Sequence, residues 1–203
     1  MNVKILTSFI SLLLICPLLY LVYSVVGLNF ETFVYLWENL LFGYSLNTIY
    51  LILLTVFFSL FLGIIPAWFV STTNFKGKQF FDVILFLPLA IPSYIIAFTY
   101  SDLLSYTGPL QSTVRNLYPN FYKYVNHDYL QPEVLSLLMA LVLYPYLYTA
   151  CRISFSLIGS NYINIAKNLG MSQFQTFLKV VIPISRVSIF SGLFLIIMEI
   201  LNE

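Results

Sequence analysis

The sequence predicts an all-α fold, a polytopic bundle of about five transmembrane helices with an amphipathic insert on its cytoplasmic side. Two properties of the composition predict a membrane protein: 60% of the residues are hydrophobic and 8% are charged, whereas soluble domains carry about 25% charged residues. A third observation sets the number of helices, because five apolar stretches each approach the roughly 20 residues that a spanning helix needs. The stretches show no alternation of period two, so we expect helices in them rather than strands.

The five apolar stretches cover about residues 5–28, 46–70, 80–104, 133–157 and 184–202. The first follows Lys4, as the apolar part of a signal peptide would, but it is too long for one and no small-residue cleavage site follows it. We therefore predict a retained N-terminal transmembrane helix over residues 1–30 and a transmembrane domain over residues 31–203.

The basic residues at the ends of these stretches predict the orientation of the chain. With the N-terminus in the cytoplasm, most Lys and Arg residues fall inside, where such residues are enriched. The inside residues are Lys4, Lys76, Lys78, Arg152, Lys167, Lys179 and Arg186, and the outside ones are Arg115 and Lys123. Residues 161–183, between the last two stretches, are therefore expected to be cytoplasmic.

The polar insert at residues 161–183 is predicted to form two short amphipathic helices. On the first helix, apolar residues recur at i, i+3, i+4 and i+7, which places them on one face. These residues are Tyr162, Ile165, Ala166 and Leu169. Gly170 has no Cβ, and we expect it to end this helix in the left-handed conformation of a C-terminal cap.

The second helix of the insert is expected to begin at Ser172, which has Gln175 three residues on and so predicts a capping box. Its apolar face repeats the spacing with Phe174, Phe177, Leu178 and Val181. Pro183 interrupts the run where the chain returns to the last apolar stretch. A helix lying flat in the lipid interface is the alternative, but such helices usually carry rows of Lys or Arg. We favour a docking element that fits a groove of a cytosolic partner.

The insert resembles the cytoplasmic EAA loop found in the permease subunits of binding-protein-dependent bacterial ABC importers. The family pattern is Glu-Ala-Ala, three residues, Gly, nine residues, Ile, one residue and Leu-Pro. The corresponding positions, which align without a gap, are Asn164, Ile165, Ala166, Gly170, Val180, Ile182 and Pro183. The first two letters of the pattern are not matched. The resemblance implies that residues 31–203 are an importer transmembrane domain with its ATPase-coupling loop at 161–183.

Other stretches look like the ferric-iron branch of these permeases in particular. They run from Asn47 through Gly63 to Trp68, from Leu87 to Tyr94, from Gly108 to Leu110 and from Leu143 to Tyr148. The resemblance implies a multi-pass protein of the bacterial inner membrane. It would pass a substrate, ferric iron in this branch, from a periplasmic binding protein to the cytoplasm by alternating access.

The resemblance also implies the partners of the chain. These are a cytoplasmic ATP-binding subunit that receives the insert, a periplasmic substrate-binding protein, a second permease half or homologous permease chain, and membrane lipid. Nucleic acid is not expected. The sequence has no Gly-rich loop ending in Gly-Lys-Ser/Thr. We therefore expect no cofactor in this chain and ATP in the partner subunit.

No catalytic or metal-binding set is expected in the chain. Enzymes that act within membranes need convergent nucleophiles, paired carboxylates or metal ligands at membrane depth, and the sequence offers none. His127 beside Asp128 lacks further metal ligands. Cys16 and Cys151 are interpreted as packing residues. The alternative function is an ATP-independent channel or a secondary carrier, which the spans alone would suit.

Five residues are candidates for a pathway or hinge: Pro66, Pro88, Pro92, Pro145 and Glu199. A proline in a helix removes an N–H and bends the axis, although these prolines could also only shape the bundle. Glu199 lies in the last stretch, where it either serves a pathway or is solvated or paired at the membrane border. Asp82 is expected near a helix start, and Gly63 and Gly192 are expected to allow close helix packing.

The length of the chain suggests a further expectation. Ferric-iron permeases usually carry two homologous halves in one polypeptide, whereas this sequence shows one half and no internal repeat. The resemblance therefore implies the N-terminal half of a permease, truncated at its C-terminus or split from its second half.

Overall fold

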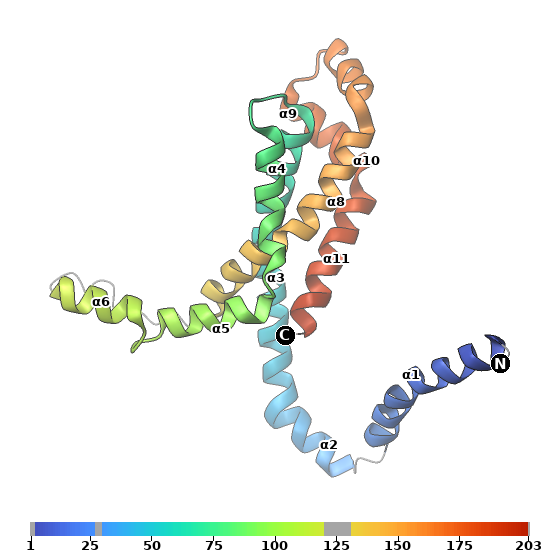
Figure 1. Ribbon diagram of the computed structural model, residues 1–203, viewed down its shortest axis with the longest axis vertical. Helices are drawn as coiled ribbons and strands as arrows, with labels where there is room; N and C mark the ends of the chain where they lie inside the picture. The colour runs from blue at the N-terminus through green and yellow to red at the C-terminus, as the bar shows by residue number, and fades with distance from the viewer. Residues whose placement is uncertain (1–2, 27–29, 120–130, 203) are drawn as a thin grey trace. The chain divides into compact units, whose positions relative to one another are not determined.

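The computed structural model describes residues 3–26, 30–119 and 131–202, and within these ranges the chain forms helices and no strand (Figure 1). The predicted all-α fold is confirmed. In chain order the helices are α1 (Val3–Val26), α2 (Phe30–Leu36), the π-helix η1 (Trp37–Leu41), α3 (Phe42–Thr72), α4 (Lys78–Phe86), the 3₁₀-helix η2 (Leu87–Ala90), α5 (Ser93–Leu104), α6 (Pro109–Leu117), α8 (Pro132–Asn168), α9 (Gln173–Thr176), the π-helix η3 (Phe177–Val181), α10 (Ile182–Ile184) and α11 (Arg186–Asn202). Three residues named above, Lys123, His127 and Asp128, lie outside the described residues.

The chain divides into two compact units, Met1–Leu46 and Asn47–Glu203. The first unit contains α1, α2, η1 and the start of α3. Most of its described apolar side chains, Leu12 and Leu18 among them, are exposed, as they are on helices that face lipid tails. Cys16 is also exposed here and is not the packing residue that we expected. The second unit contains the remainder of α3 and the elements from α4 to α11, and it holds the buried core.

The described chain has two helical runs long and apolar enough to cross a membrane, Phe30–Thr72 and Pro132–Ile158. The number rises to four if each of two bent helix pairs is one span. The expected third span is bent by 80° between Ala90 and Ser93, and the expected fifth is preceded by a 72° bend between Ile184 and Arg186. The first expected span corresponds to α1, in which Ser11–Ser24 is a shorter apolar helix. The described residues therefore give two to four spans where the sequence predicts about five.

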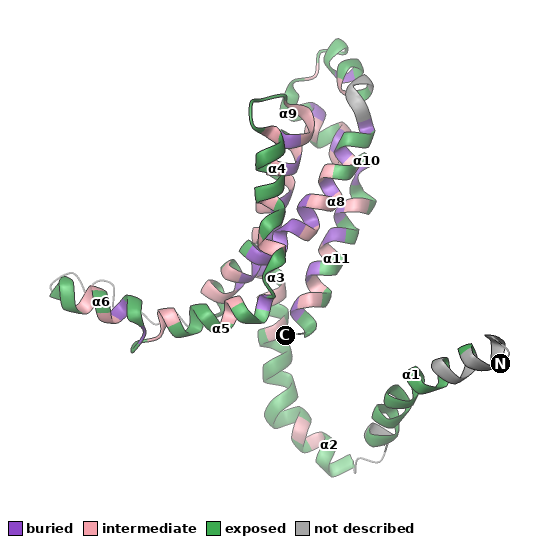
Figure 2. Cartoon of the chain, viewed as in Figure 1, coloured by how far each residue is buried: buried purple, intermediate pink, exposed green. Residues whose placement is uncertain are grey.

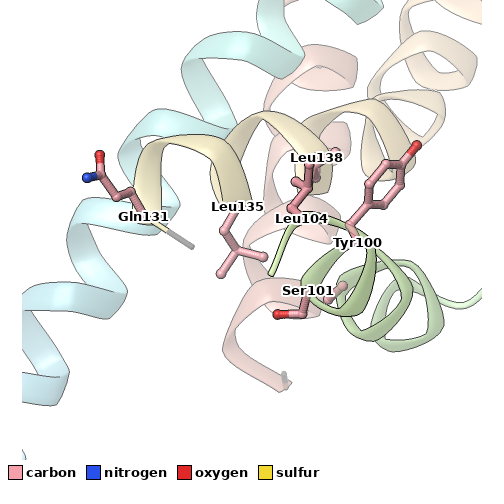
Figure 3. Close-up of a pocket in the computed structure, with 7 residues that line it drawn as sticks. Tyr100, Ser101, Leu104, Gln131, Leu135 and Leu138 are labelled. Carbon is pink, nitrogen blue, oxygen red and sulfur yellow. The ribbon is translucent and has the colours of Figure 1, made fainter. Parts of the chain in front are cut away.

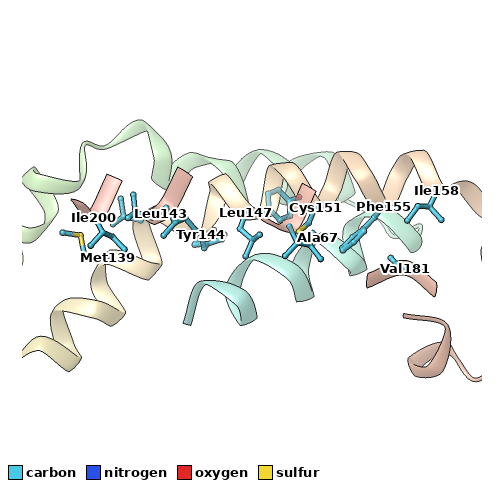
Figure 4. Packing of buried hydrophobic residues seen from close by; sticks show 14 residues of the cluster. Ala67, Met139, Leu143, Tyr144, Leu147, Cys151, Phe155, Ile158, Val181 and Ile200 are labelled. Atoms are coloured by element: carbon cyan, nitrogen blue, oxygen red, sulfur yellow. The ribbon is translucent and has the colours of Figure 1, made fainter. Parts of the chain in front are cut away.

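The core of the second unit is built around α8, and Figure 2 shows buried residues along both α8 and α11. Buried side chains recur at every fourth position of α8 (Figure 4), which places them on one face of the helix. These residues are Met139, Leu143, Leu147, Cys151 and Phe155. Ile189, Ile196 and Ile200 supply the facing surface from α11, and Ala67 contributes from α3. Cys151 is thus a packing residue, as expected.

Two glycines bring α3 and α11 close to the same leucine of α8. A Cβ at Gly63 would lie 3.0 Å from Leu147 Cγ, and a Cβ at Gly192 would lie 2.8 Å from Leu147 Cα. Lipid tails are as apolar as leucine, so helices in a membrane associate largely through such close van der Waals contact. The expected packing role of both glycines is confirmed.

Candidate functional site

The first helix of the insert at residues 161–183 is the end of α8. We predicted a separate short helix after residue 161, but α8 continues without interruption to Asn168. The physical reason is that no proline lies between Ile158 and Asn168, and nothing there removes a backbone hydrogen bond from the ladder. The insert is thereby a direct extension of a core helix.

The turn between the two insert helices has the predicted cap at Gly170. This residue has φ +81°, and its N–H donates to the carbonyl of Lys167 at 2.9 Å. The N–H of Met171 donates to the carbonyl of Ala166 at 3.0 Å. These two bonds form a Schellman motif, which requires a left-handed residue at this position.

The second insert helix begins with the predicted capping box. The Gln175 N–H donates to Ser172 Oγ at 3.2 Å, and the Ser172 N–H donates to Gln175 Oε1 at 3.0 Å. The helix then continues as α9, η3 and α10 to Ile184. Pro183 lies inside α10, and the chain turns two residues later, at Ser185. Local hydrogen bonds therefore fix both sides of the turn between the two insert helices.

The apolar stripes of the insert are divided between the interior and the surface. Ala166 is 3% exposed and Val181 is fully buried. By contrast Leu169 is 73% exposed and Phe174 is 69% exposed. Among the other positions of the EAA-like pattern, Asn164, Ile165, Gly170 and Pro183 are exposed, and Val180 and Ile182 are half-buried. Large apolar side chains thus remain uncovered on both sides of the Gly170 turn.

An aromatic cluster joins the insert to the bundle, and sequence reasoning did not find it. The rings of Trp68 on α3 and Phe177 on η3 have centroids 5.1 Å apart. Phe155 on α8 lies 6.1 Å from Trp68 and 6.4 Å from Phe177, both edge to face. Such pairs contribute about 0.5–1.5 kcal/mol each beyond burial.

We expect Phe177→Ala to lower the free energy of unfolding by about 2 kcal/mol, less than the ~3–5 kcal/mol of a fully buried phenylalanine, because it removes two ring contacts. Phe174→Ala is the matched control, since Phe174 lies three residues away and is exposed; we expect about 0.5 kcal/mol or less. Thermal unfolding of the purified chain in detergent measures both. Equal shifts for the two variants would show that the cluster contributes no stability.

The candidate hinge prolines fall into two groups. Pro66 lies inside α3 and Pro145 inside α8, and both helices continue through them. Pro88 lies in the 3₁₀-helix η2, and Pro92 precedes the first residue of α5 with ψ 136°. The 80° bend lies at this second pair. A bend is therefore present at Pro88 and Pro92, whereas no break occurs at Pro66 or Pro145.

Glu199 lies beside the bend in the third span. Ser93, the first residue of α5 and itself buried, donates a hydrogen bond from Oγ to Glu199 Oε1 at 3.3 Å. Ser93 directly follows Pro92, so this hydrogen bond links the start of α5 to Glu199 of α11. Glu199 is paired within the protein.

We expected Asp82 near the start of a helix, but it is the fifth residue of α4 and faces α8. Its Oδ1 accepts a hydrogen bond from the Tyr148 hydroxyl at 2.5 Å, and its Oδ2 forms an ion pair with Arg152 Nη2. The sequence signal was present: Tyr148 and Arg152 are four residues apart on one helix face, so one acidic side chain can meet both. The three residues line a pocket of about 360 Å³.

A second, smaller pocket lies between α5 and the start of α8 (Figure 3). Tyr100, Ser101 and Gln131 supply its polar groups, and its volume is about 80 Å³. A water occupies about 30 Å³ in the liquid, so the pocket has room for a few waters. None of the residues that line it is charged.

The long apolar helices of the bundle define a membrane protein of the all-α class. Residues 59–203 match the family described as "Binding-protein-dependent transport system inner membrane component". The chain belongs to this family, whose members are permeases of ABC transporters and not enzymes.

Curated relatives are themselves transport permeases. The chain is 24% identical over 180 residues to the sulfate transport system permease protein of Escherichia coli (strain K12), covering 86% of this chain and 61% of the relative. It is 27% identical over 158 residues to a probable sulfate transport system permease protein of Helicosporidium, covering 77% and 55%. It is 29% identical over 141 residues to the molybdenum transport system permease protein of Haemophilus influenzae, covering 70% and 59%.

Two facts follow from these relatives. The chain spans between about half and two thirds of the length of the relatives named here, from 55% to 61%. The relatives are named for sulfate and molybdenum, so the expectation of a ferric-iron permease is not supported. The stretches that suggested the iron branch include spans and turns, such as the bend at Pro92, that position helices rather than select a substrate.

Proposed function

We propose that this chain is a transmembrane subunit of an ATP-driven importer in the bacterial inner membrane. It passes substrate from a periplasmic binding protein to the cytoplasm by alternating access, together with a second permease chain or half. The observation that carries the proposal is the uncovered apolar surface of the insert, with Leu169 and Phe174 held on either side of a rigid cap. Such a surface fits the groove of a cytoplasmic ATP-binding subunit.

The proposed orientation places the N-terminus in the cytoplasm. It is supported by the excess of basic residues at the inner ends of the spans, Lys167 and Lys179 of the insert among them. In this orientation the insert faces the cytosol, where the ATP-binding subunit is present.

The route from the insert to the spans follows the packed residues. The first half of the insert is continuous with α8. The second half is joined to α3 and α8 through Phe177, Trp68 and Phe155. Movement of a docked ATP-binding subunit would therefore shift α3 and α8 as a rigid body and exchange the inward-open and outward-open states.

We propose a tetrahedral oxyanion of the sulfate and molybdate class as the substrate. The names of the curated relatives support this class. Ferric iron is the competing candidate from the sequence, and it differs in charge sign, so uptake assays separate the two clearly.

The expected result is that cells carrying the complete transporter take up labelled sulfate or molybdate, and that deletion of this chain lowers the uptake to background. A transporter with an ATP-binding subunit that cannot hydrolyse ATP serves as the control and should also give background uptake. Uptake of ferric iron instead of either oxyanion would refute the substrate class. Uptake that survives in the hydrolysis-deficient control would favour an ATP-independent channel or carrier.

A further inference from the structure

Asp82, Tyr148 and Arg152 form a charged cluster between α4 and α8 that the coupling route does not use. Arg152 is the one basic residue of the candidate span Pro132–Ile158, all of which the structure describes. It lies six residues before Ile158, or about 9 Å along the helix axis from the end of the span. Charged side chains at such depth are costly and often mark the pathway of a substrate.

The helix that carries Asp82 is weakly packed. None of the nine residues of α4, each of them described, is buried. Asp82 supplies an ion pair and a hydrogen bond from α4 to α8, while most of the apolar side chains around it, Phe81 and Val83 among them, are exposed. The bend after η2 separates α4 from α5. Asp82 can therefore move away from Arg152 without the loss of a packed core.

The cluster also contains donors that the described structure does not satisfy. Arg152 Nε and Thr149 Oγ1 are buried and have no hydrogen-bond partner among the described residues. Both residues line the pocket of about 360 Å³, together with Asp82 and Tyr148. A buried donor without an acceptor costs about 1–3 kcal/mol. An arrangement that supplies acceptors to both groups would recover this cost.

We propose that Arg152, assisted by Thr149, binds the transported oxyanion near the cytoplasmic end of the pathway, and that Asp82 is the internal carboxylate that the oxyanion displaces. The inference rests on the proposed oxyanion substrate. A guanidinium has five donors in a planar fork that pairs with carboxylates and with tetrahedral oxyanions alike. The pocket, at about 360 Å³, is many times larger than the roughly 30 Å³ that one water occupies in the liquid. It therefore has room for a tetrahedral anion.

Charge explains why the two anions compete for Arg152. Like charges a few ångströms apart repel strongly where the effective dielectric is low, so Asp82 and a dianion do not share one guanidinium. While Asp82 is paired, the pocket is neutral and holds no anion tightly. When α4 withdraws, Arg152 retains its charge and its unpaired donors, and Thr149 adds a hydroxyl to the same site.

The test measures binding of inorganic sulfate and molybdate to the full chain in lipid nanodiscs by isothermal titration calorimetry. We expect Asp82→Asn to bind the oxyanion at least tenfold more tightly than the wild type, because Arg152 is then unpaired. We expect Arg152→Gln to lose binding, also in combination with Asp82→Asn. If the ion pair is purely structural, both single variants lower the melting temperature and neither changes oxyanion affinity.

Two further variants keep the test decisive if Asp82→Asn folds poorly. Tyr148→Phe removes one hydrogen bond to Asp82 without a change in charge and should raise oxyanion affinity by a few-fold. Thr149→Val keeps the shape of the side chain but removes the hydroxyl, and it should lower oxyanion affinity. Unchanged affinity in both variants would overturn the inference.

Uptake by the complete transporter, measured in parallel, separates this inference from the proposed function. If the transporter takes up sulfate or molybdate while Asp82→Asn leaves the affinity unchanged, the site is wrong and the function stands. If the transporter takes up neither oxyanion and no variant binds one, the proposed substrate class is wrong as well.

Discussion

Replacing Gly170 with valine is expected to weaken association with the proposed ATP-binding subunit by about tenfold while the chain still inserts into the membrane. Gly170 holds φ +81°, and an L-residue in this region costs about 1–2 kcal/mol. Valine would therefore leave the left-handed conformation and change the angle between α8 and α9. The valine variant would have to return to the left-handed conformation to dock, and binding would bear the cost of about 1–2 kcal/mol. A cost of about 1.4 kcal/mol raises the dissociation constant tenfold.

Gly170→Asn is the matched control for this prediction. Nothing lies within 4 Å of a Cβ at this position, so neither side chain meets a steric obstacle. Asparagine visits the left-handed region readily and should retain near wild-type association. The measurement is the binding of the ATP-binding subunit to the chain in nanodiscs, with the amount of chain in the membrane as the insertion readout. Equal binding by the Val and Asn variants would show that the cap does not determine docking.

The second large effect is expected at Gly192. A Cβ there would lie 2.8 Å from the Cα of Leu147, which is a backbone atom and can move only if α11 moves away from α8. Overpacking of this kind costs about 1–3 kcal/mol, so we expect Gly192→Ala to lower the melting temperature of the chain clearly. Gly43→Ala is the control, since a Cβ at Gly43 meets nothing within 4 Å.

Combining each glycine variant with Leu147→Ala tests whether backbone or side-chain contact with Leu147 causes the loss of stability. A Cβ at Gly63 would meet only side-chain atoms of Leu147, at 3.0–3.1 Å, whereas a Cβ at Gly192 would meet its Cα. Leu147→Ala removes the side-chain contacts beyond Cβ, including that of Cδ1 at 3.1 Å from a Cβ at Gly192, but keeps the Cα. It should therefore restore the stability of Gly63→Ala more fully than that of Gly192→Ala. If Leu147→Ala rescues both variants equally, backbone contact does not limit the approach of α11.

The insert was the most predictable part of the candidate site because its structure is local. The Gly170 cap and the Ser172–Gln175 box each use hydrogen bonds between residues no more than five positions apart. Residue type and spacing specify such bonds directly. The sequence did not predict which residues of the apolar stripe are buried and which are exposed, because periodicity identifies one face of a helix without showing what covers it. Ala166 is covered and Leu169 is not.

The approximate positions of the apolar helices were predicted, but their number and continuity as spans were not. Hydropathy responds to composition over about 20 residues and carries no information on backbone angles. Four prolines had the same sequence signal, yet among them only Pro88 and Pro92 lie at a break between helices. Pro145 lies in a fully buried position of α8, where packing on neighbouring helices keeps the helix continuous.

The sequence by itself determined that this is an all-α membrane protein with an amphipathic insert whose central turn holds a left-handed glycine and a capping box. These properties follow from composition and from hydrogen bonds between near neighbours. Only the tertiary structure decided that Asp82 meets Tyr148, 66 residues away, and that Ser93 meets Glu199, 106 residues away. The physical reason is that such pairs depend on where whole helices come to rest, and close contacts such as those of Gly63 and Gly192 with Leu147 set those positions.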